Sequence, residues 1–415
     1  MYIKKVALEN IKAIDSGELD FCPDGANYAG WSVITGDNGA GKTALLKAIS
    51  MAVLGPDQSR ALVPDLRGWI TQGASRGTVS VEVVPDPVFD RNQPPFEAGI
   101  EFVDKDGMTD IAATTNGTAV TEGPWAPAGG GWLTVGYGPF RRLYGSSLDA
   151  QRLMTIPGRI PRFATLFKED ATLAECEAWV KQLNYRQLEH RQDASRTLST
   201  LLALLNDDFL RHGLRLDGVD SDGIWLRDKV GRVMPLADMS EGYRVALATL
   251  IDIFRHMVLA YGSDGLTKLA ADGTTIVQRP AVVLIDEIDA HLHPAWQREI
   301  GFWLTQHFPL VQFIVTTHSP LVCQAADHGR IYHIPQPGDG EPPARLDRDS
   351  YEQIIRGRSD EVLLTPAFGL RHTRSPRAVQ ARQRRAELVA KRQAVGRLAN
   401  DETEELHRLE VFAAR

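Results

Sequence analysis

The sequence predicts an α/β fold with a mixed or parallel core sheet, an antiparallel β layer, a helical lobe and a C-terminal helical appendage. A glycine-rich loop lies between an apolar segment and a helical segment at residues 31–49. Two short apolar runs, 281–285 and 312–315, suit strands that are buried on both faces of a parallel sheet. With 415 residues, the chain is long enough for two or three domains.

The first third of the chain is predicted to form mainly strands, because apolar and polar residues alternate there. The alternating segments are 3–8, 17–21, 77–84 and 99–103. The last two indicate an antiparallel layer inserted after the first helix. Residues 104–131 are rich in Gly, Thr, Ala and Pro and end in Gly129–Gly131, so we expect a loop. A strand at 132–135 should follow and lead into Tyr137–Arg142.

Helical spacing of apolar residues dominates the middle of the chain. The expected elements are helices at 166–211, a hairpin at 224–236, a helix at 241–258, a polar loop at 262–279 and a helix at 295–306. We therefore expect four parts. They are a first lobe at 1–165 with the glycine-rich loop, a helical second lobe at 166–262, a return to the core at 263–335 and the helical appendage at 336–415.

The composition is that of an ordinary soluble protein, with 43% hydrophobic and 24% charged residues. No run approaches the roughly 18 apolar residues that a membrane span needs. The three cysteines, Cys22, Cys176 and Cys323, lie far apart and form no metal-ligand spacing. We expect a cytoplasmic protein without a membrane partner. The net charge of −7 argues against a chain that coats nucleic acid over its whole surface.

Charge is unevenly distributed near the C-terminal end. Residues 371–397 contain nine basic side chains and one acidic one, Glu387, and acidic residues dominate 401–410. Such a block could bind nucleic acid or a partner protein. It could equally form a solvated helical hairpin in which opposite charges face each other. The sequence leaves both alternatives open.

The segment Gly36–Thr43 matches a phosphate-binding loop at every position, between a strand and a helix. Its glycines let backbone N–H groups curl around a polyphosphate, at which the following helix points its positive N-terminus. Lys42 would reach the outer phosphates, and the Thr43 hydroxyl would ligate Mg²⁺. We therefore expect nucleoside triphosphate binding. The residues expected to contact the nucleotide here are Gly36, Asn38, Gly39, Ala40, Gly41, Lys42 and Thr43.

Asp286 and Glu287 close the apolar strand at 281–285, at the carboxyl edge of the expected sheet and beside the phosphate loop. Asp286 would hold Mg²⁺, and Glu287 would polarise the attacking water. The second buried strand ends at Thr316–Pro320, where His318 could contact the γ-phosphate.

A third segment, Met239–Arg244, directly precedes the long helix. Ser240 and Gly242 would form an anion-binding cap at the N-terminus of this helix, by the same physics as the phosphate loop. Taken alone, a serine before a helix is an ordinary N-cap. Its position in the sequence, after the phosphate loop and before Asp286, is what indicates a functional role for this serine.

In this order the motifs resemble the ATP-binding cassette (ABC) ATPases, in the branch that contains the SMC and RecF heads. The matching segments are Walker A at 36–43, the signature at 239–244, Walker B with Asp286 and Glu287, the D-loop at 289–294 and the switch His318. Within that branch, Asp286–Pro294 resembles the overcoming-lysogenization-defect ATPases. The signature and the segment Tyr137–Arg141 are similar to Septu-type and retron-associated anti-phage ATPases.

The resemblance implies ATP and Mg²⁺ as ligands, and Lys42, Glu287 and His318 as the catalytic residues. It also implies a homodimer or higher oligomer that closes head to tail, so that Ser240 and Gly242 cap the nucleotide of the partner. A glutamine that senses Mg²⁺ cannot be placed: Gln72 is one candidate, and the segment Tyr137–Arg142 is an alternative.

Three functions follow from the resemblance. The first is the sensor or regulator of an anti-phage defence complex, with a separate effector chain such as a nuclease, because we expect no nuclease domain in the residues after His318. The second is a RecF-like repair ATPase that binds DNA through 371–397. A transporter subunit is disfavoured by the Glu241 of the signature. The binding of DNA or RNA is left open.

Overall fold

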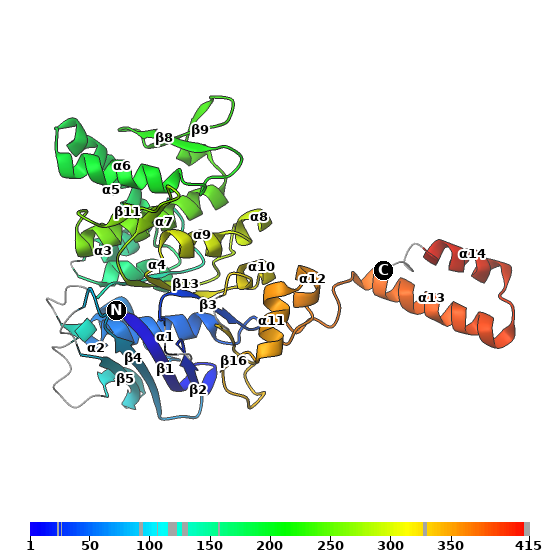
Figure 1. The fold of residues 1–415 in the computed structure, drawn as a ribbon. Helices are drawn as coiled ribbons and strands as arrows, with labels where there is room; N and C mark the ends of the chain where they lie inside the picture. Colours follow the sequence, from blue (N-terminus) through cyan, green and yellow to red (C-terminus); the bar gives the residue numbers. More distant parts are fainter. Residues whose placement is uncertain are drawn as a thin grey trace. The chain divides into compact units, whose positions relative to one another are not determined.

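The computed structural model describes the chain except residues 23, 24, 26, 91–93, 106, 115–122, 127–131, 157, 327–329 and 411–415. It forms two compact units, Met1–Gly357 and Arg358–Arg415. The first unit contains the α/β fold that the sequence predicts (Figure 1). Among the described residues, no helix is long and apolar enough to cross a lipid bilayer. The four predicted parts of the chain stay predictions.

A central sheet of six strands organises the first unit. In spatial order the strands are β16 (Ala344–Arg345), β15 (Ile331–His333), β3 (Gly30–Thr35), β14 (Val311–Thr316), β13 (Ala281–Ile285) and β7 (Thr134–Tyr137). All neighbours except the β15–β16 pair are parallel, so the carboxyl ends of β3, β14, β13 and β7 meet at one edge. The predicted strands at 281–285 and 312–315 are confirmed, and both are fully buried.

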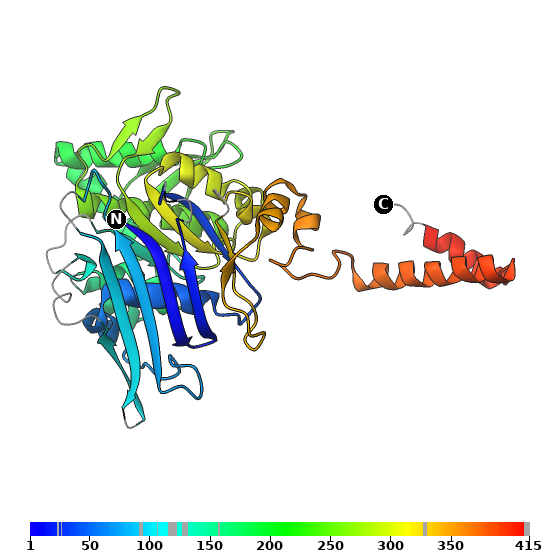
Figure 2. The ribbon, with the colours of Figure 1, turned by 60° about the horizontal axis from the view of Figure 1, so that its bottom comes forward.

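An antiparallel sheet forms a second layer, with its strands side by side in Figure 2. In order these are β2 (Ile14–Asp20), β1 (Tyr2–Ile11), β4 (Arg76–Val84), β5 (Phe96–Lys105) and β6 (Met108–Ala113). The prediction of a loop over residues 104–131 is wrong at two places. Strand β6 pairs with β5, and a short 3₁₀ helix covers Gly123–Trp125. Met108–Ala113 forms the edge strand of this sheet because it pairs with β5, and the local composition does not reveal that pairing. Gly129–Gly131 lie outside the described residues.

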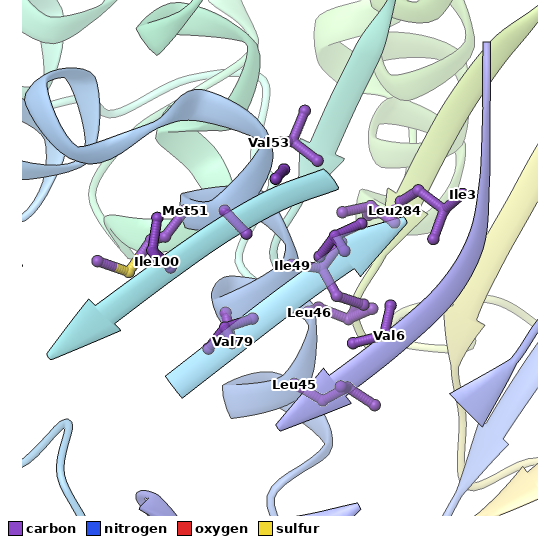
Figure 3. Packing of buried hydrophobic residues seen from close by; sticks show 14 of the residues in the cluster. Ile3, Val6, Leu45, Leu46, Ile49, Met51, Val53, Val79, Ile100 and Leu284 are labelled. Carbon is purple, nitrogen blue, oxygen red and sulfur yellow. The ribbon is translucent and has the colours of Figure 1, made fainter. Parts of the chain in front are cut away.

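Helix α1 (Lys42–Leu54) lies between the two sheets. Eleven of its residues are buried, so the helix is covered on all sides rather than amphipathic. Its Leu46 and Ile49 belong to one core with Val79 of the antiparallel sheet and Leu284 of the central sheet (Figure 3). Gln312, buried in β14, joins the two sheets directly, because its side-chain amide exchanges two 2.7 Å hydrogen bonds with the backbone of Ile3.

Helix α9 (Ile300–His307) covers the opposite face of the central sheet. Alternate residues of β14, including Phe313, point to that face, where Phe313 packs 5.4 Å from Trp31 between ring centroids. Gly301 lets α9 approach closely: a Cβ there would lie 3.0 Å from the Trp31 ring. The single helix expected at 295–306 is divided into α8 (Pro294–Gln297) and α9.

The helical lobe contains α5 (Ala174–Leu188), α6 (Gln192–Leu205) and the long α7 (Glu241–Tyr261), in agreement with the helical spacing. A three-stranded sheet of β8 (Arg215–Val219), β9 (Ile224–Arg227) and β10 (Val233–Pro235) extends the expected hairpin. The polar loop expected at 262–279 instead contains the hairpin β11 (Thr267–Leu269) and β12 (Thr275–Val277). Strands of three residues are too short to show an alternating pattern in sequence.

Shorter helices complete the first unit. They are α2 (Pro56–Leu62), α3 (Leu148–Thr155), a 3₁₀ turn (Ile160–Phe163), α4 (Ala164–Phe167), a 3₁₀ turn (Leu236–Asp238), α10 (Pro320–Cys323) and α11 (Arg348–Arg356).

The second unit contains α12 (Ser359–Val362) and a hairpin of α13 (Pro376–Val395) and α14 (Asn400–Leu409). The basic and acidic blocks face each other: Arg384 pairs with Glu405 at 3.0 Å and Lys391 with Glu402 at 2.5 Å. The structure of this segment is therefore the helical hairpin with facing opposite charges, the second of the two alternatives. Nucleic-acid binding by residues 371–397 stays a prediction.

Replacement of Leu46 by alanine should lower the free energy of unfolding by about 2–5 kcal/mol, because the cavity between two sheets cannot collapse easily. Leu46 is fully buried in the core around α1. The measurement is chemical denaturation, with Leu148→Ala as control because Leu148 is 74% exposed. Equal losses in the two variants would show that α1 is not the centre of the core.

Candidate nucleotide site

The phosphate loop connects β3 to α1, and its glycines adopt conformations that other residues avoid. Gly36, Gly39 and Gly41 have φ angles of 148°, 84° and 109°. A Cβ at Gly36 would also lie 2.6 Å from the carbonyl oxygen of Ile334. The loop thus has the backbone that a phosphate cradle requires. Asn38 is exposed on it, and Ala40 is buried beneath it.

The side chain of Lys42 lies inside this loop. Its Nζ donates hydrogen bonds to the carbonyl oxygens of Gly36, at 2.7 Å, and Asp37, at 2.9 Å. Lys42 is only 7% exposed, and this burial lowers its pKa, while the carboxylates of Asp286 and Glu287 oppose the shift. A nearly desolvated ammonium inside a glycine-rich loop is suited to an anion with several negative charges.

Asp286 is the centre of the site. It is completely buried, and its two carboxylate oxygens accept hydrogen bonds from Thr43 at 2.6 Å and from Thr316 at 2.5 Å. The parallel register that places Ile285 beside Val315 brings Asp286 next to Thr316, and the first turn of α1 supplies Thr43. A hydroxyl and a carboxylate oxygen at this distance fit the oxygen ligands that Mg²⁺ prefers.

Glu287 follows Asp286 in a left-handed conformation, with a φ of 45°, which is uncommon for a residue other than glycine. Its backbone N–H donates a 2.8 Å hydrogen bond to the hydroxyl oxygen of Thr316. Its side chain is half-buried. Uncommon backbone conformations of this kind gather at functional sites, where the surroundings must stabilise them.

His318, the predicted switch residue, is exposed just after β14, and its neighbours on both sides are linked by hydrogen bonds to the segment 289–297. Thr317 donates a hydrogen bond to the carboxylate of Asp289. Ser319 donates one to the side chain of Gln297, which in turn donates to the carbonyl oxygen of Leu292 at 2.9 Å. The segment that carries His318 therefore has a fixed position relative to Walker B and the D-loop.

The signature residues line a different hollow from the phosphate loop. Ser240 is the N-cap of α7, but its hydroxyl accepts no hydrogen bond from that helix, and the residue is exposed. A Cβ at Gly242 would lie 2.4 Å from the carbonyl oxygen of His291 in the D-loop. The hollow is lined by Ser240, Gly242, Tyr243, His291, His293 and Trp296, with Arg211, His212 and Ala295. Thus Lys42, Thr43, Asp286 and Glu287 come together, and Ser240 and Gly242 form a second group.

Two further residues of the site did not stand out as such in the sequence. Thr316, a threonine at a strand end, links Asp286 to Glu287 through its hydroxyl. Arg141 is 3% exposed and donates to the backbone carbonyl oxygens of residues 286–288, at the end of Walker B. Burial lowers the pKa of Arg141 to about 10, while the carboxylates of Asp286 and Asp289 oppose the shift. The segment Tyr137–Arg142 carried the only sequence signal for Arg141.

The candidate glutamine Gln72 is exposed and lies in the turn after Ile70, which bridges to Ile11 at the end of β1. Among the described residues, no cluster of three or more His, Cys, Asp and Glu side chains could hold a metal ion.

Two family models match the chain. The model described as "AAA domain, putative AbiEii toxin, Type IV TA system" matches residues 153–324, and the model described as "AAA domain" matches residues 5–113. Together they include the segments with the signature, Walker A and Walker B.

Relatives of known name agree with these models. The chain is 26% identical over 381 residues to a Septu protein PtuA of Bacillus mycoides (strain KBAB4), covering 88% of the chain and 44% of that protein. It is 41% identical over 105 residues to the Retron Ec83 probable ATPase of Escherichia coli, covering 25% of the chain and 18% of that protein. The chain spans less than half the length of the curated relatives it matches.

A solved structure shows the fold. The SMC head bound to the C-winged helix domain of ScpA superimposes with a TM-score of 0.51 at 17% identity, over 84% of this chain and 99% of that one. The motifs, the SMC-head fold and the named relatives together show that the chain resembles the SMC/RecF-like ABC ATPases, and among them those of the anti-phage defence type.

Proposed function

We propose that this chain binds and hydrolyses ATP, and that it acts as the sensor or regulator subunit of an anti-phage defence complex whose effector is a separate chain. The observation that carries the enzymatic part is the position of Asp286, which is hydrogen-bonded to both Thr43 and Thr316, with Glu287 directly after it. This geometry combines a magnesium ligand pair with an adjacent general base, beside a phosphate cradle.

The residues would divide the chemistry as follows. The loop N–H groups and Lys42 bind the β- and γ-phosphates, and Thr43 and Asp286 hold Mg²⁺, which when bound neutralises phosphate charge. Glu287 accepts a proton as the water oxygen bonds to the γ-phosphorus and the bond to the bridging oxygen of ADP breaks. His318, exposed at the end of β14, contacts the γ-phosphate.

Dimerisation is supported by the separation of the two groups of residues. Ser240 is exposed and does not cap its own helix, so its hydroxyl is available to a ligand. The hollow it lines contains no residue of the phosphate loop of the same chain. Two chains closing head to tail would place this hollow over the nucleotide of the partner, and hydrolysis would reopen the pair.

The defence role rests on the relatives. Septu and retron proteins are the named relatives that the chain matches, and it spans only part of their length. A regulator that closes and opens with ATP needs an effector to act on, and we propose a protein such as a nuclease in that role.

Replacement of Lys42 by alanine should weaken ATP binding about tenfold to a hundredfold, since a charge-assisted hydrogen bond contributes about 1.5–3 kcal/mol. Isothermal titration with ATP and Mg²⁺ measures the dissociation constant, and phosphate release measures turnover. Lys229→Ala, which changes an exposed lysine of the helical lobe, is the control. Full turnover in the Lys42 variant would contradict the assignment of the loop.

Replacement of Glu287 by glutamine should reduce turnover about a hundredfold or more and leave ATP bound, because general-base catalysis is lost and the phosphate contacts remain. The ATP-bound variant should be dimeric by light scattering or sedimentation. Adding Ser240→Arg to this variant should keep ATP binding but leave the protein monomeric, since the bulk would block closure.

Two outcomes of that experiment would count against the clamp. A Glu287→Gln protein that stays monomeric with saturating ATP excludes nucleotide-driven dimerisation. Loss of ATP binding in the Ser240→Arg variant means that the signature serves the nucleotide of its own chain.

The Glu287→Gln protein is also the bait for the effector. Purified with a tag from its native host in ATP and Mg²⁺, it should carry one stoichiometric protein partner with nuclease, toxin or reverse transcriptase activity. The Lys42→Ala protein is the control, because a partner specific to the ATP-bound state should be absent from it. Nuclease-sensitive DNA without a fixed protein partner would favour a RecF-like repair function instead.

A further inference from the structure

The end of β7 contacts the end of Walker B. The strands β7 and β13 are parallel neighbours, with Tyr137 opposite Ile285. The backbone N–H of Asp286 continues this pairing with a 2.8 Å hydrogen bond to the carbonyl oxygen of Tyr137. The segment after Tyr137 therefore runs beside the residues that carry out hydrolysis in the proposed function.

Arg141, four residues after Tyr137, is the contact between the two segments. Its Nη1 donates to the carbonyl oxygens of Gly138 at 2.8 Å and Asp286 at 2.9 Å. Its Nη2 donates to the carbonyl oxygens of Glu287 at 3.2 Å and Ile288 at 3.1 Å. One guanidinium thus binds three consecutive carbonyl groups, those of residues 286–288, and a fourth from its own loop.

Three successive carbonyl groups can converge on one cation only where the backbone turns sharply. Glu287 is at the centre of this turn, and its left-handed φ of 45° is the conformation that the turn demands. Its N–H is bound by Thr316 and its carbonyl oxygen by Arg141. Both polar groups of the Glu287 backbone are therefore fixed, which in turn fixes the direction of its Cα–Cβ bond.

We propose that Arg141 is a positioning residue for hydrolysis, which holds the backbone of Glu287 in the turn that aims its carboxylate at the attacking water. The inference rests on the proposed ATPase function and assigns a role to the segment Tyr137–Arg142. Lysine cannot replace this arginine, because its ammonium lacks the planar fork that serves several fixed acceptors.

The fold supplies a matched control. Arg330 is also 3% exposed and binds successive backbone carbonyls, those of Asn27, Tyr28 and Ala29, with the contact to Ala29 at 2.8 Å. It lies at the amino ends of β15 and β3, away from the edge where the phosphate loop begins. Loss of Arg330 removes a comparable buried clamp without touching the site.

The experiment compares Arg141→Gln, Arg141→Lys and Arg330→Gln as full-length proteins, by turnover, ATP affinity, thermal melting and ATP-dependent dimerisation. Arg141→Gln should lower kcat about a hundredfold, as expected for loss of a general base. Its ATP affinity should stay within about threefold, and it should stay dimeric with bound ATP. Arg141→Lys should show the same split of kcat from affinity. Arg330→Gln should melt earlier but keep its kcat.

A double-mutant cycle with Glu287→Gln separates positioning from general damage. If Arg141 acts through Glu287, adding Arg141→Gln to Glu287→Gln should lower turnover by no more than about twofold further, because residues that act as a unit are non-additive. A full additional loss would overturn the proposal, as would an Arg141 variant that loses affinity and kcat together. If Arg141→Gln does not fold, Arg141→Lys decides the question. Unchanged turnover in Glu287→Gln alone would refute the proposed function instead.

Discussion

The site depends on the hydrogen bonds of one buried carboxylate. Asp286 has no exposure to solvent, so its charge must be compensated by the groups around it. Thr43 and Thr316 each satisfy one of its oxygens, and its backbone pairs with Tyr137. These three partners come from α1, β14 and β7, so the position of Asp286 is correct only when the central sheet and its first helix are assembled.

That assembly is why α1 has to be buried on all sides. A helix between two sheets cannot tilt without opening a cavity against one of them, so its N-terminus, with Thr43, has a fixed height above the sheet. The amide of Gln312 adds a polar contact that keeps β1 in place over β14. The rigid layers thus specify where the phosphate loop begins and ends, and the hydrogen bonds from Lys42 to the carbonyl oxygens of Gly36 and Asp37 hold its backbone.

The elements that the sequence predicted correctly are those whose sequence pattern is determined by neighbouring residues in the chain. Buried parallel strands give continuous apolar runs, and phosphate loops need glycine, lysine and threonine at fixed positions, so both could be identified without tertiary information. The strand β6 and the hairpin β11–β12 could not, because short strands form where a partner strand lies beside them. Arg141 was hidden for the same reason: its four acceptors are backbone carbonyls, three of them about 145 residues away in the chain, and carbonyl groups leave no trace in a sequence.

The two groups of functional residues are separate, but the same helix connects them. In the first turn of α7, Gly242 packs against the carbonyl oxygen of His291, and the space between them is too small for a side chain at position 242. Further along, Asp252 of α7 accepts a 3.0 Å hydrogen bond from the hydroxyl of Tyr137. Tyr137 in turn pairs with Asp286 through its carbonyl oxygen. A ligand that pushed the N-terminus of α7 toward His291 would press on the D-loop, and a shift of the whole helix would act on the end of β7. Under the proposed head-to-tail closure, the nucleotide of one chain would in this way act on Asp286 and Glu287 of the other.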